Sequence, residues 1–279
     1  MKSKIPYHIE HNCNGALKSP DDTSDWIFEH LAHGPPGTYM SEFPDEFDLR
    51  KHTLTVRDQG ERGTCAAFAA AAIKEIQENR DNGFIGYMSP EFIYYHRQNK
   101  PGNGMYGRNV FQILQKIGSV PESMYPYKTN VDEPLQAPSK KLYRYAAQFR
   151  IANFARVTTI DGLKRALLEM GPCYLLLPLF STGPTFWCDD ESKCRGGHAV
   201  TVIGYTTEGF IIRNSWGEEW NSDGHIIFPY ADWGAQWECW VTIDEKLEKV
   251  VLAEKTKSIK EPKAIKIGKK KRKMGCMIM

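Results

Sequence analysis

A cysteine at the start of an alanine-rich helix is the feature that most constrains how this chain can fold. Residues 59–68 read QGERGTCAAF, so a glycine-containing loop delivers Cys65 to the first turn of a helix that the sequence predicts over 64–79. The run of alanines lets other elements pack closely against this helix, as a buried central helix requires. The pattern therefore predicts a globular body built around the helix that begins near Cys65.

The position of Cys65 also gives its sulfur a special environment. In the first turn of a helix the backbone N–H groups lack helical partners, and they lie at the positive end of the helix dipole. Both features favour a thiolate over a thiol, and the thiolate is the nucleophilic form of cysteine. A core cysteine at a helix start is the alternative, because cysteine is among the most buried residue types.

Two further segments supply the partners that a nucleophilic cysteine needs. Residues 196–200 read GGHAV and residues 213–217 read RNSWG, within a region of short β-like runs between about 172 and 243. His198 opens one predicted strand, and Asn214 ends the next strand of a predicted hairpin. Neighbouring antiparallel strands can bring such residues within hydrogen-bonding reach. A thiolate, an imidazole and an amide that fixes the imidazole's tautomer together form an activated nucleophile.

Helical patterns precede strand patterns along the chain. A second helix is predicted over 109–117, and the strand-like runs are CYLLLPLF, HAVTVIGY, GFIIRNSW, HIIFPY and CWVTI. Helices first and strands afterwards predict an α+β chain with two segregated halves. The hydrophobic fraction of 41% and the charged fraction of 25% fit such a body and exclude a wholly disordered chain.

From Phe43 to about Asp244 the sequence resembles the papain family of cysteine proteases. The segment FPDEFDLRKHTLTVRDQG is similar to the family's mature N-terminal approach, and Gln59 stands six residues before Cys65. The 133 residues from Cys65 to His198 agree with the spacing in that family. Several matched positions in the family's order are more specific than any single motif.

The resemblance implies a role for each matched residue. Cys65 is the expected nucleophile, and His198 is the expected base. Asn214 orients the imidazole, the Gln59 side chain contributes to the oxyanion hole, and Trp216 shields the Asn–His hydrogen bond from water. The implied reaction is hydrolysis of a peptide bond through an acyl-enzyme, with no metal and no other cofactor.

The resemblance also implies a papain-like two-lobed fold with the active site in the cleft between the lobes. A helical lobe over about 43–155 carries the cysteine, and an antiparallel, barrel-like β lobe over about 156–244 carries the histidine and the asparagine. Gly104, Gly197 and Trp216 are expected to bind an extended polypeptide substrate.

Glu238 is assigned to the substrate site through a loose alignment over 233–240. There it would line the pocket for the residue before the scissile one and favour arginine or lysine. Because the alignment is loose, the sequence favours the other interpretation, an exposed glutamate on the rim of the cleft.

Two residues near Cys65 depart from the family pattern Cys-Gly-Ser/Ala-Cys-Trp. Arg62 replaces the first cysteine, which removes one of the family's disulfides, and Ala66 replaces the tryptophan, which leaves a packing gap. The stretch GGHAV…GYTTEGFIIRNSWG is similar to prokaryotic-type and giant-virus members more than to lysosomal cathepsins. Seven cysteines at irregular spacings, with no apolar secretory signal before them, indicate reduced thiols in a cytosol-like compartment.

Two other classes of function are alternatives. One is a catalytically inactive papain-fold module that holds a peptide in the cleft. The other is a papain-fold transglutaminase or related thiol acyltransferase. The four matched residues together argue against the first, and the Gln59 spacing and the Asn-Ser-Trp-Gly segment favour a peptidase over the second.

Residues 1–42 form an N-terminal extension. Ser19 and Pro20 fit the cap and first position of a short helix over SPDDTSDWIFEHLAH. Related proteases are made with an inhibitory pro-segment that fills the cleft, and this extension occupies the same place in the chain. One hypothesis is that it blocks Cys65, with Cys13 nearby. The other is a surface extension that carries an incidental thiol.

Cys188 and Cys194 precede His198 in the sequence. The five residues between the two cysteines exceed the usual spacing of zinc ligands, and the histidine already has a role. A loop disulfide or two free thiols is therefore expected in place of a metal site.

A mildly acidic body ends in a strongly basic tail. Residues 254–279 carry ten Lys/Arg and two Glu, which is +8, so the other 253 residues carry −6. Cys276 begins a prenylation box, CMIM, whose terminal methionine favours farnesyl. One lipid chain binds membranes only marginally, and KKKRK at 269–273 would add about 1 kcal/mol per residue on an anionic leaflet. A nuclear-localisation or nucleic-acid patch is the alternative, which the lack of a basic stripe in the body disfavours.

These features together predict a cytoplasmic, monomeric peptidase. Its expected partners are a polypeptide substrate and the anionic surface of a membrane, with no nucleic acid. We expect the protein to act in a eukaryotic cell, which includes a virus-infected cell, and not to be secreted. No run approaches the roughly eighteen apolar residues that a spanning helix needs.

Overall fold

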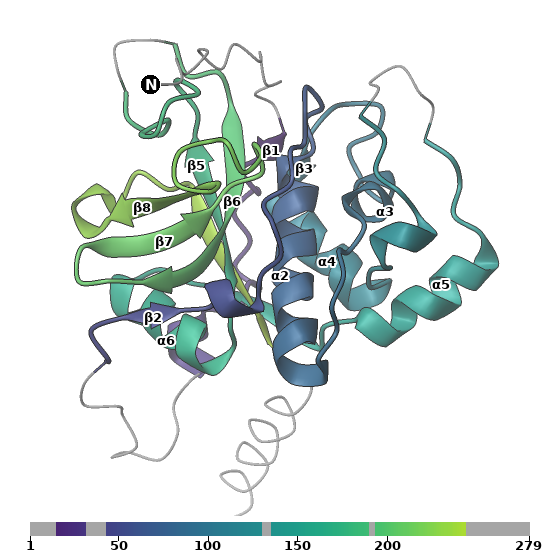
Figure 1. Ribbon diagram of the computed structural model, residues 1–279, viewed down its shortest axis with the longest axis horizontal. Coiled ribbons are helices and arrows are strands. Elements are labelled where there is room, and N and C mark those ends of the chain that lie inside the picture. Colours follow the sequence, from purple (N-terminus) through teal and green to yellow (C-terminus); the bar gives the residue numbers. More distant parts are fainter. Residues whose placement is uncertain (1–14, 32–42, 130–134, 190–192, 244–279) are drawn as a thin grey trace, which may run out of the picture.

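The computed structural model describes residues 15–31, 43–129, 135–189 and 193–243. Two lobes lie side by side, one mainly of strands with α6 (Ile160–Glu169) packed against them and one mainly of helices, and α2 (Cys65–Asn82) stands where they meet (Figure 1). This is the predicted α+β, two-lobed architecture. The other α-helices in the described ranges are α1 (Phe28–Leu31), α3 (Pro90–Tyr95), α4 (Gly107–Lys116) and α5 (Lys140–Ala146).

The strands form one sheet with the order β3-β1-β6-β5-β9-β4, in which β2 also pairs with β6, and β7 pairs with β6 and β8. The pairs are antiparallel except for β1 with β3. All the strand-like runs predicted after residue 172 form strands. The bounds are β1 (Ala16–Leu17), β2 (Phe47–Asp48), β3 (Met105–Tyr106), β4 (Asn153–Arg156), β5 (Cys173–Pro178), β6 (Gly197–Tyr205), β7 (Gly209–Arg213), β8 (His225–Pro229) and β9 (Glu238–Ile243).

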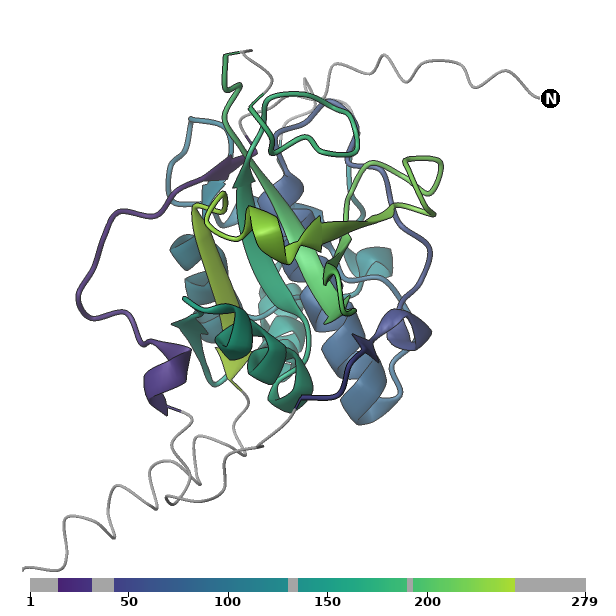
Figure 2. The ribbon, with the colours of Figure 1, turned by 90° about the vertical axis from the view of Figure 1, so that its left-hand side faces the viewer.

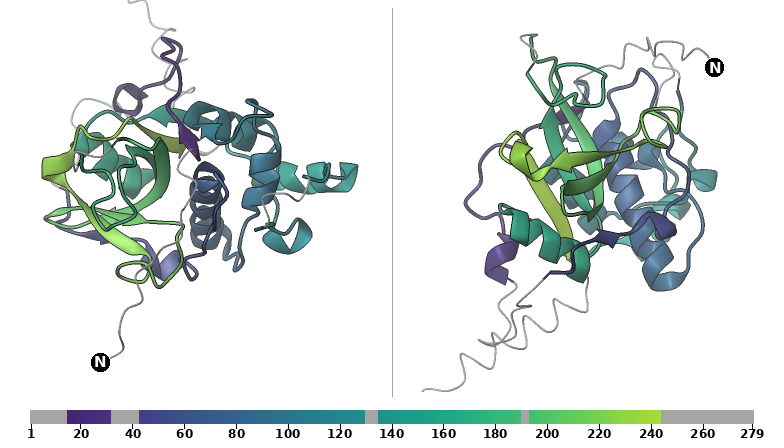
Figure 3. Two further views of the ribbon diagram at one scale, coloured as in Figure 1. Left: turned by 90° about the horizontal axis from the view of Figure 1, so that it is seen from above. Right: turned by 60° about the vertical axis from the view of Figure 1, so that its left-hand side comes forward.

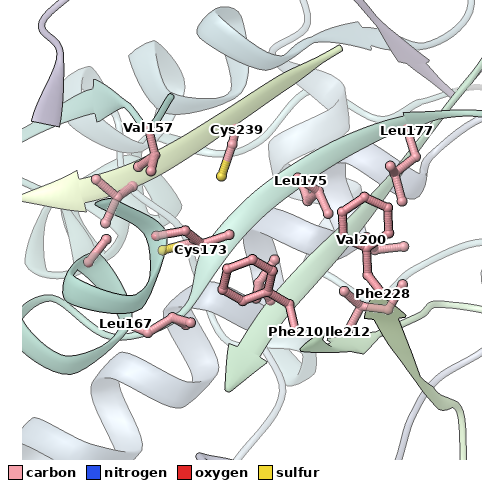
Figure 4. Packing of buried hydrophobic residues seen from close by; sticks show 14 of the residues in the cluster. Val157, Leu167, Cys173, Leu175, Leu177, Val200, Phe210, Ile212, Phe228 and Cys239 are labelled. Carbon is pink, nitrogen blue, oxygen red and sulfur yellow. The ribbon is translucent and has the colours of Figure 1, made fainter. Parts of the chain in front are cut away.

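Strand β5 is buried on both faces because a hydrophobic core lies on each side of it. Cys173, Leu175 and Leu177 belong to the core of the β lobe, where they pack with residues of β6, β7, β8 and α6 (Figure 4). Tyr174 and Leu176, which alternate with them, belong to the core that surrounds α2. The period of two along a strand therefore divides this one element between both cores.

The predicted helices at 64–79 and 109–117 are confirmed as α2 and α4. The alanines of α2 are buried, and Thr201 of β6 donates a hydrogen bond from its hydroxyl to the Ala69 carbonyl at 3.1 Å. This contact brings β6 directly against the helix. Helix α2 ends at Gly83, whose φ of 67° is the left-handed conformation that glycine adopts without strain.

The predicted helix over 19–33 is wrong for most of its length. Within the described residues only Phe28–Leu31 is α-helical there. Ser19 does not cap a helix in its own segment. Its hydroxyl donates to Glu238 at 3.2 Å and accepts the N–H of Arg108, in the first turn of α4, at 2.9 Å. The Ser19 side chain, which the local pattern assigned to a cap, thus binds residues that are distant in the sequence.

Residues 15–31, called here the N-terminal segment, run from the junction of the lobes to the outside of the molecule. Seen from above, β1 lies between the β lobe and the helical lobe (Figure 3). The chain then passes along the outer surface to α1, which lies beside α6 (Figure 2). Ile27 forms a parallel bridge with Arg156 at the end of β4.

Several predictions concern residues that the structure does not describe. Cys13 and the basic tail over 245–279 with Cys276 lie outside the described residues. In the part that is described, no helix has both the length and the apolar character needed to cross a membrane.

Candidate active site

Cys65 is the first residue of α2 and lies at the interface of the two lobes. Its side chain is buried, and the residue is 1% exposed. The Ala199 N–H, one residue after His198 on β6, donates to the Cys65 sulfur at 3.5 Å. A cysteine from the helical lobe and the histidine strand of the β lobe thus meet, although 133 residues separate them in the sequence.

His198 and Asn214 form the predicted hydrogen bond. The histidine lies near the start of β6, and the asparagine directly follows β7, which pairs with β6. Nε2 of His198 lies 2.7 Å from Oδ1 of Asn214. The same oxygen accepts the Ser215 N–H at 2.8 Å, which fixes the amide so that its oxygen faces the ring. The imidazole is therefore held in one orientation, with Nδ1 left as its other proton-carrying position.

Aromatic rings enclose this hydrogen bond. The ring of Trp216 stacks on His198 with centroids 4.4 Å apart and an interplanar angle of 29°. Phe186 meets the other rings edge-on, at 5.2 Å from His198 and 5.4 Å from Trp216. All three side chains are buried, so water is kept from the imidazole–amide contact.

Gln59 connects the loop before Cys65 to the loop that carries Asn214. Its amide oxygen accepts the Ser215 hydroxyl at 2.7 Å, and its backbone N–H donates to the Ser215 carbonyl at 2.8 Å. Its Nε2 donates to the Arg62 carbonyl at 2.9 Å. The Gln59 side chain is thus held firmly next to the loop that delivers the cysteine.

Arg62, which stands where the family pattern has a cysteine, is anchored by charge. It binds Glu91 through both of its terminal nitrogens, at 2.5 and 3.3 Å. Its guanidinium also lies over the Tyr127 and Tyr94 rings, at 4.9 and 5.4 Å from their centroids. An ion pair with aromatic packing therefore anchors this loop at the position where the family pattern has a cysteine. Ala66 is fully buried in the core that also contains Ala16 of the N-terminal segment.

The N-terminal segment occupies the space in front of Cys65. Ala16 pairs in parallel with Met105 and antiparallel with Gly197, so β1 joins one lobe to the other. Gly15 lies so close that a Cβ on it would be 2.5 Å from the Cys65 sulfur. Both backbone positions expected to bind substrate, at Gly197 and next to Gly104, are taken by the chain's own N-terminal segment.

Glu238 is the first residue of β9, and it is buried and not an exposed residue on the rim of the cleft. Its side chain is fully buried, and both the N–H and the hydroxyl of Ser19 donate to its carboxyl oxygens at 3.2 Å. A Cβ on Gly107 would be 2.2 Å from one of these oxygens, so only glycine leaves room for the carboxyl group there. Burial raises the pKa of Glu238 despite the hydrogen bonds from Ser19.

Comparison with known proteins agrees with this geometry. The family model described as papain family cysteine protease matches residues 43–242, which is more than two thirds of the chain.

The chain belongs to the papain family.

Among its relatives, mouse (Mus musculus) cathepsin K is 29% identical over an alignment of 198 residues that covers 66% of this chain and 59% of the cathepsin. An uncharacterized peptidase C1-like protein of Acanthamoeba polyphaga mimivirus is 30% identical over an alignment of 218 residues that covers 66% of this chain and 68% of that protein. The chain therefore spans less than two thirds of the length of the cathepsin that it matches.

Solved structures show the same fold. Xylellain, a cysteine protease from Xylella fastidiosa, superimposes with a TM-score of 0.72 at 24% identity, over 86% of this chain and 99% of xylellain. Procathepsin L 3 from the larval midgut of Tenebrio molitor gives a TM-score of 0.61 at 19% identity, over 83% and 76% of the two chains.

The remaining cysteines of this papain-family chain differ from Cys65 in their surroundings. Cys188 and Cys194 are not joined in a disulfide, and Cys194 donates from its thiol to the Gly196 carbonyl at 3.4 Å. Burial raises the pKa of the Cys173 and Cys239 thiols, which keeps both in the neutral, unreactive form. Within the described ranges, no three His, Cys, Asp or Glu side chains gather as metal ligands would.

Two residues of the site were missed from the sequence. Ser215 binds both Gln59 and Asn214, and Phe186 packs on the imidazole ring. The Asn-Ser-Trp-Gly segment contained the first, but nothing in the pattern gave its serine a role. The second lies in a loop, where an aromatic pair such as Phe186–Trp187 is the only local signal of burial.

Proposed function

We propose that this chain is a cysteine endopeptidase that its own N-terminal segment holds inactive. The observation that carries the proposal is the meeting of three parts at one place. The Cys65 sulfur lies against the strand of His198, Asn214 orients the ring, and Gly15 lies directly on the sulfur.

The geometry supports acyl transfer. The Cys65 thiolate attacks the substrate carbonyl carbon, and the resulting oxyanion accepts hydrogen bonds from the Cys65 N–H and the Gln59 amide. The imidazolium of His198 gives its proton to the leaving amine, which breaks the peptide bond and leaves a thioester. His198 then takes a proton from water, whose oxygen attacks the thioester and releases the acid and the thiol. Asn214 keeps the ring in the tautomer that both steps need.

Inhibition follows from the position of β1. Because Ala16 already pairs with β3 and β6, a substrate strand cannot pair there until the N-terminal segment leaves. A cut within 32–42 would break the covalent link between the segment and the body, so that the segment can dissociate while the body chain stays whole.

The test is a peptide-library assay on three forms of the full chain. An external protease cuts a recognition site placed within 32–42, and cut protein is compared with uncut protein and with cut Cys65→Ala. We expect cut wild type to cleave peptides, uncut protein to do so at least tenfold more slowly, and the Cys65→Ala form to be inactive. Equal activity of cut and uncut protein would remove the inhibitory role, and an inactive cut wild type would remove the peptidase.

We further propose that Glu238 selects a basic side chain at the residue before the scissile one. In the closed structure its two oxygens accept the N–H and O–H of Ser19. A lysine or arginine side chain entering from the cleft would supply replacement donors and add a positive charge to that of Arg156, whose Nη2 lies 3.7 Å from the carboxyl group.

The same cut protein tests this preference. Cut wild type should prefer Lys or Arg over Leu at that position, and Glu238→Gln should reverse the preference. Glu208→Gln, which changes an exposed glutamate of the β lobe, is the matched control. A library profile that Glu238→Gln leaves unchanged would contradict the assignment.

We also propose that the tail tethers the enzyme to a membrane. The support is the sequence alone: CMIM at 276–279 fits farnesylation, and KKKRK at 269–273 supplies the electrostatic attraction that one lipid chain needs. Expressed in a eukaryotic cell, the protein should gain the mass of one farnesyl group and sediment with membranes. Cys276→Ser should abolish both effects and Cys188→Ser neither. An unmodified Cys276 would overturn the tether.

A further inference from the structure

Beyond the cleft, the N-terminal segment is held by two carboxylates. Asp25 binds a pair of arginines, and Glu29 binds the start of α6. Neither contact is needed to cover Cys65, because Gly15 and Ala16 already do so. The body therefore carries a carboxylate-binding surface that is separate from the catalytic residues.

The arginine pair spans both lobes. Arg108 belongs to α4 in the helical lobe and binds Asp25 through Nε and Nη2, at 2.8 and 2.7 Å. Arg156 ends β4 in the β lobe and binds the same carboxyl group through Nε at 2.7 Å. The two arginine side chains are 14% and 18% exposed even with the N-terminal segment in place. Charge-assisted, bidentate geometry of this kind is selective for a carboxylate.

The arginine pair is oriented by its surroundings, as a built site requires. The guanidinium of Arg156 lies 4.7 Å from the centroid of the Trp240 ring, and its Nη2 lies 3.7 Å from Glu238. Arg108 lies 5.9 Å from the same ring. Glu238 is a body carboxylate that faces the pair, and its single negative charge cannot balance two guanidinium groups. Without Asp25 the two guanidinium groups would hold excess positive charge.

The start of α6 forms the second part of the surface. One carboxyl oxygen of Glu29 accepts the N–H groups of Thr158 and Thr159 at 2.7 and 2.8 Å, and both of their hydroxyls at 3.1 and 3.0 Å. A Cβ on Gly162 would be 2.2 Å from this oxygen, so glycine is needed for the carboxylate to approach. Four donors at the positive end of a helix suit an anion.

We propose that, once the N-terminal segment has left, Arg108, Arg156 and the start of α6 bind acidic residues of the polypeptide substrate. The inference rests on the proposed peptidase and its inhibition. The Ser19–Glu238 contact lies between Gly15 and Asp25 along the segment. Because the proposed Glu238 pocket takes the residue before the scissile one, the surface lies on the side of the substrate's N-terminal part. It serves as an exosite that recognises substrates with acidic residues upstream of the cut.

The experiment measures two substrates in one reaction. Both peptides share one cleavable sequence, and one carries Asp and Glu about eight to fourteen residues upstream, a reach similar to that from Gly15 to Glu29. The other carries Asn and Gln at the same positions. Full chain cut within 32–42 cleaves both together, so the ratio of their kcat/KM values does not depend on the fraction of active enzyme.

We expect wild type to favour the acidic peptide by about tenfold, and Arg156→Gln and Arg108→Gln each to bring the ratio near one. Arg156→Lys, which keeps the positive charge but loses the planar set of donors of the guanidinium group, should give an intermediate ratio. Arg144→Gln, on exposed α5, is the matched control and should leave the ratio unchanged. A short peptide without the upstream part should be cleaved by every variant, which shows that the fold and catalytic site are intact. Any change in its rate through the Arg156–Glu238 contact affects both long peptides equally and cancels in their ratio.

The outcomes separate this proposal from the one on which it rests. Cleavage of both peptides by wild type at equal rates would overturn the exosite and leave the peptidase standing. A ratio that survives both arginine substitutions would do the same. No cleavage of either peptide would remove the peptidase itself.

Discussion

The two ends of the N-terminal segment are held in different ways. Residues 15–19, the cleft half, are held largely by main-chain pairing of β1 with β3 and β6. Residues 25–31, the latch half, are held by the carboxylates of Asp25 and Glu29 on the outside of the body. The cleft half depends on close fit and the latch half on charge, so substitutions and pH should affect them separately.

The carboxyl groups that hold the two halves have pKa shifts of opposite direction. Burial disfavours the Asp25 and Glu29 anions, but hydrogen bonds from Arg108, Arg156 and the start of α6 outweigh it and lower the pKa of both carboxyl groups. In the cleft half, burial raises the pKa of Glu238, the partner of Ser19. Acid therefore weakens the latch half through Asp25 and Glu29.

The largest expected effect comes from removing the Cys65 nucleophile, which belongs to the body and to neither half of the N-terminal segment. Cys65→Ala should lower peptide cleavage by cut protein by roughly a thousandfold or more, because no nucleophile remains to form the thioester. Cys194→Ala, which removes a half-buried thiol of the β lobe, should leave the rate unchanged. Initial rates on one fluorogenic peptide measure both. Substantial cleavage by the Cys65→Ala protein would show that another group carries the reaction.

The second effect is on the cleft half alone. In Gly15→Val the new side chain would have to occupy space within 2.5 Å of the Cys65 sulfur and 3.0 Å of the Gly63 carbonyl carbon. Such overpacking costs about 1–3 kcal/mol, which should raise the alkylation rate of Cys65 by iodoacetamide in uncut protein by about fivefold to 150-fold. Lys18→Val, at an exposed position of the same segment, is the control. An unchanged alkylation rate would mean that Gly15 does not limit access.

The sequence predicted where Cys65, His198 and Asn214 lie because its signals are local. A glycine loop before a run of alanines located Cys65 at a helix start, and alternating strands located His198 and Asn214 on neighbouring strands. Each of these predictions depends on short-range periodicity.

The latch could not be predicted in this way. Asp25 finds Arg108 and Arg156 at separations of 83 and 131 residues, and Ser19 finds Glu238 at 219. The local pattern assigned Ser19 to a cap on its own helix and favoured an exposed Glu238, and both predictions were wrong. The two side chains instead form hydrogen bonds with residues that are distant in the sequence. Charged residues that pair across such distances leave no period in the sequence.

The third effect is on the latch half alone. Asp25→Asn would leave two arginines without their shared anion and should weaken docking of the latch half by about 2 kcal/mol. Trp26 reports this half, because its carbonyl accepts the Arg156 N–H at 2.7 Å and its side chain is 39% exposed. Labelled with fluorinated tryptophan, the variant should show the Trp26 resonance moved to its free position. Trp26→Phe assigns that resonance, and Asp45→Asn, outside the segment, is the control.

The fourth effect is a pH dependence with a defined sign. Because the pKa values of Asp25 and Glu29 are lowered on docking, their stabilisation is present above their ordinary values of 3.8 and 4.5 and is lost as the pH falls below them. The Trp26 resonance should therefore shift between pH 5 and about pH 3. The alkylation rate of Cys65, corrected with a denatured control, should change less. Asp25→Asn with Glu29→Gln should abolish the Trp26 transition, and a transition that persists would assign the acid response to other groups.

The smallest effect tests how much each donor at the start of α6 contributes to binding Glu29. Thr158→Val removes one hydroxyl donor at 3.1 Å and keeps the backbone N–H donor at 2.7 Å. The lost hydrogen bond is exposed, so it should weaken docking by about 0.5–1 kcal/mol, a twofold to fivefold change in the Trp26 equilibrium. Thr129→Val, an exposed threonine of the helical lobe, is the control. A loss as large as that of Asp25→Asn would mean that the α6 contact, not the arginine pair, dominates the latch. No loss at all would mean that the two backbone N–H groups and the Thr159 hydroxyl suffice, and the charge of Glu29 would then be held by the helix end without help from Thr158.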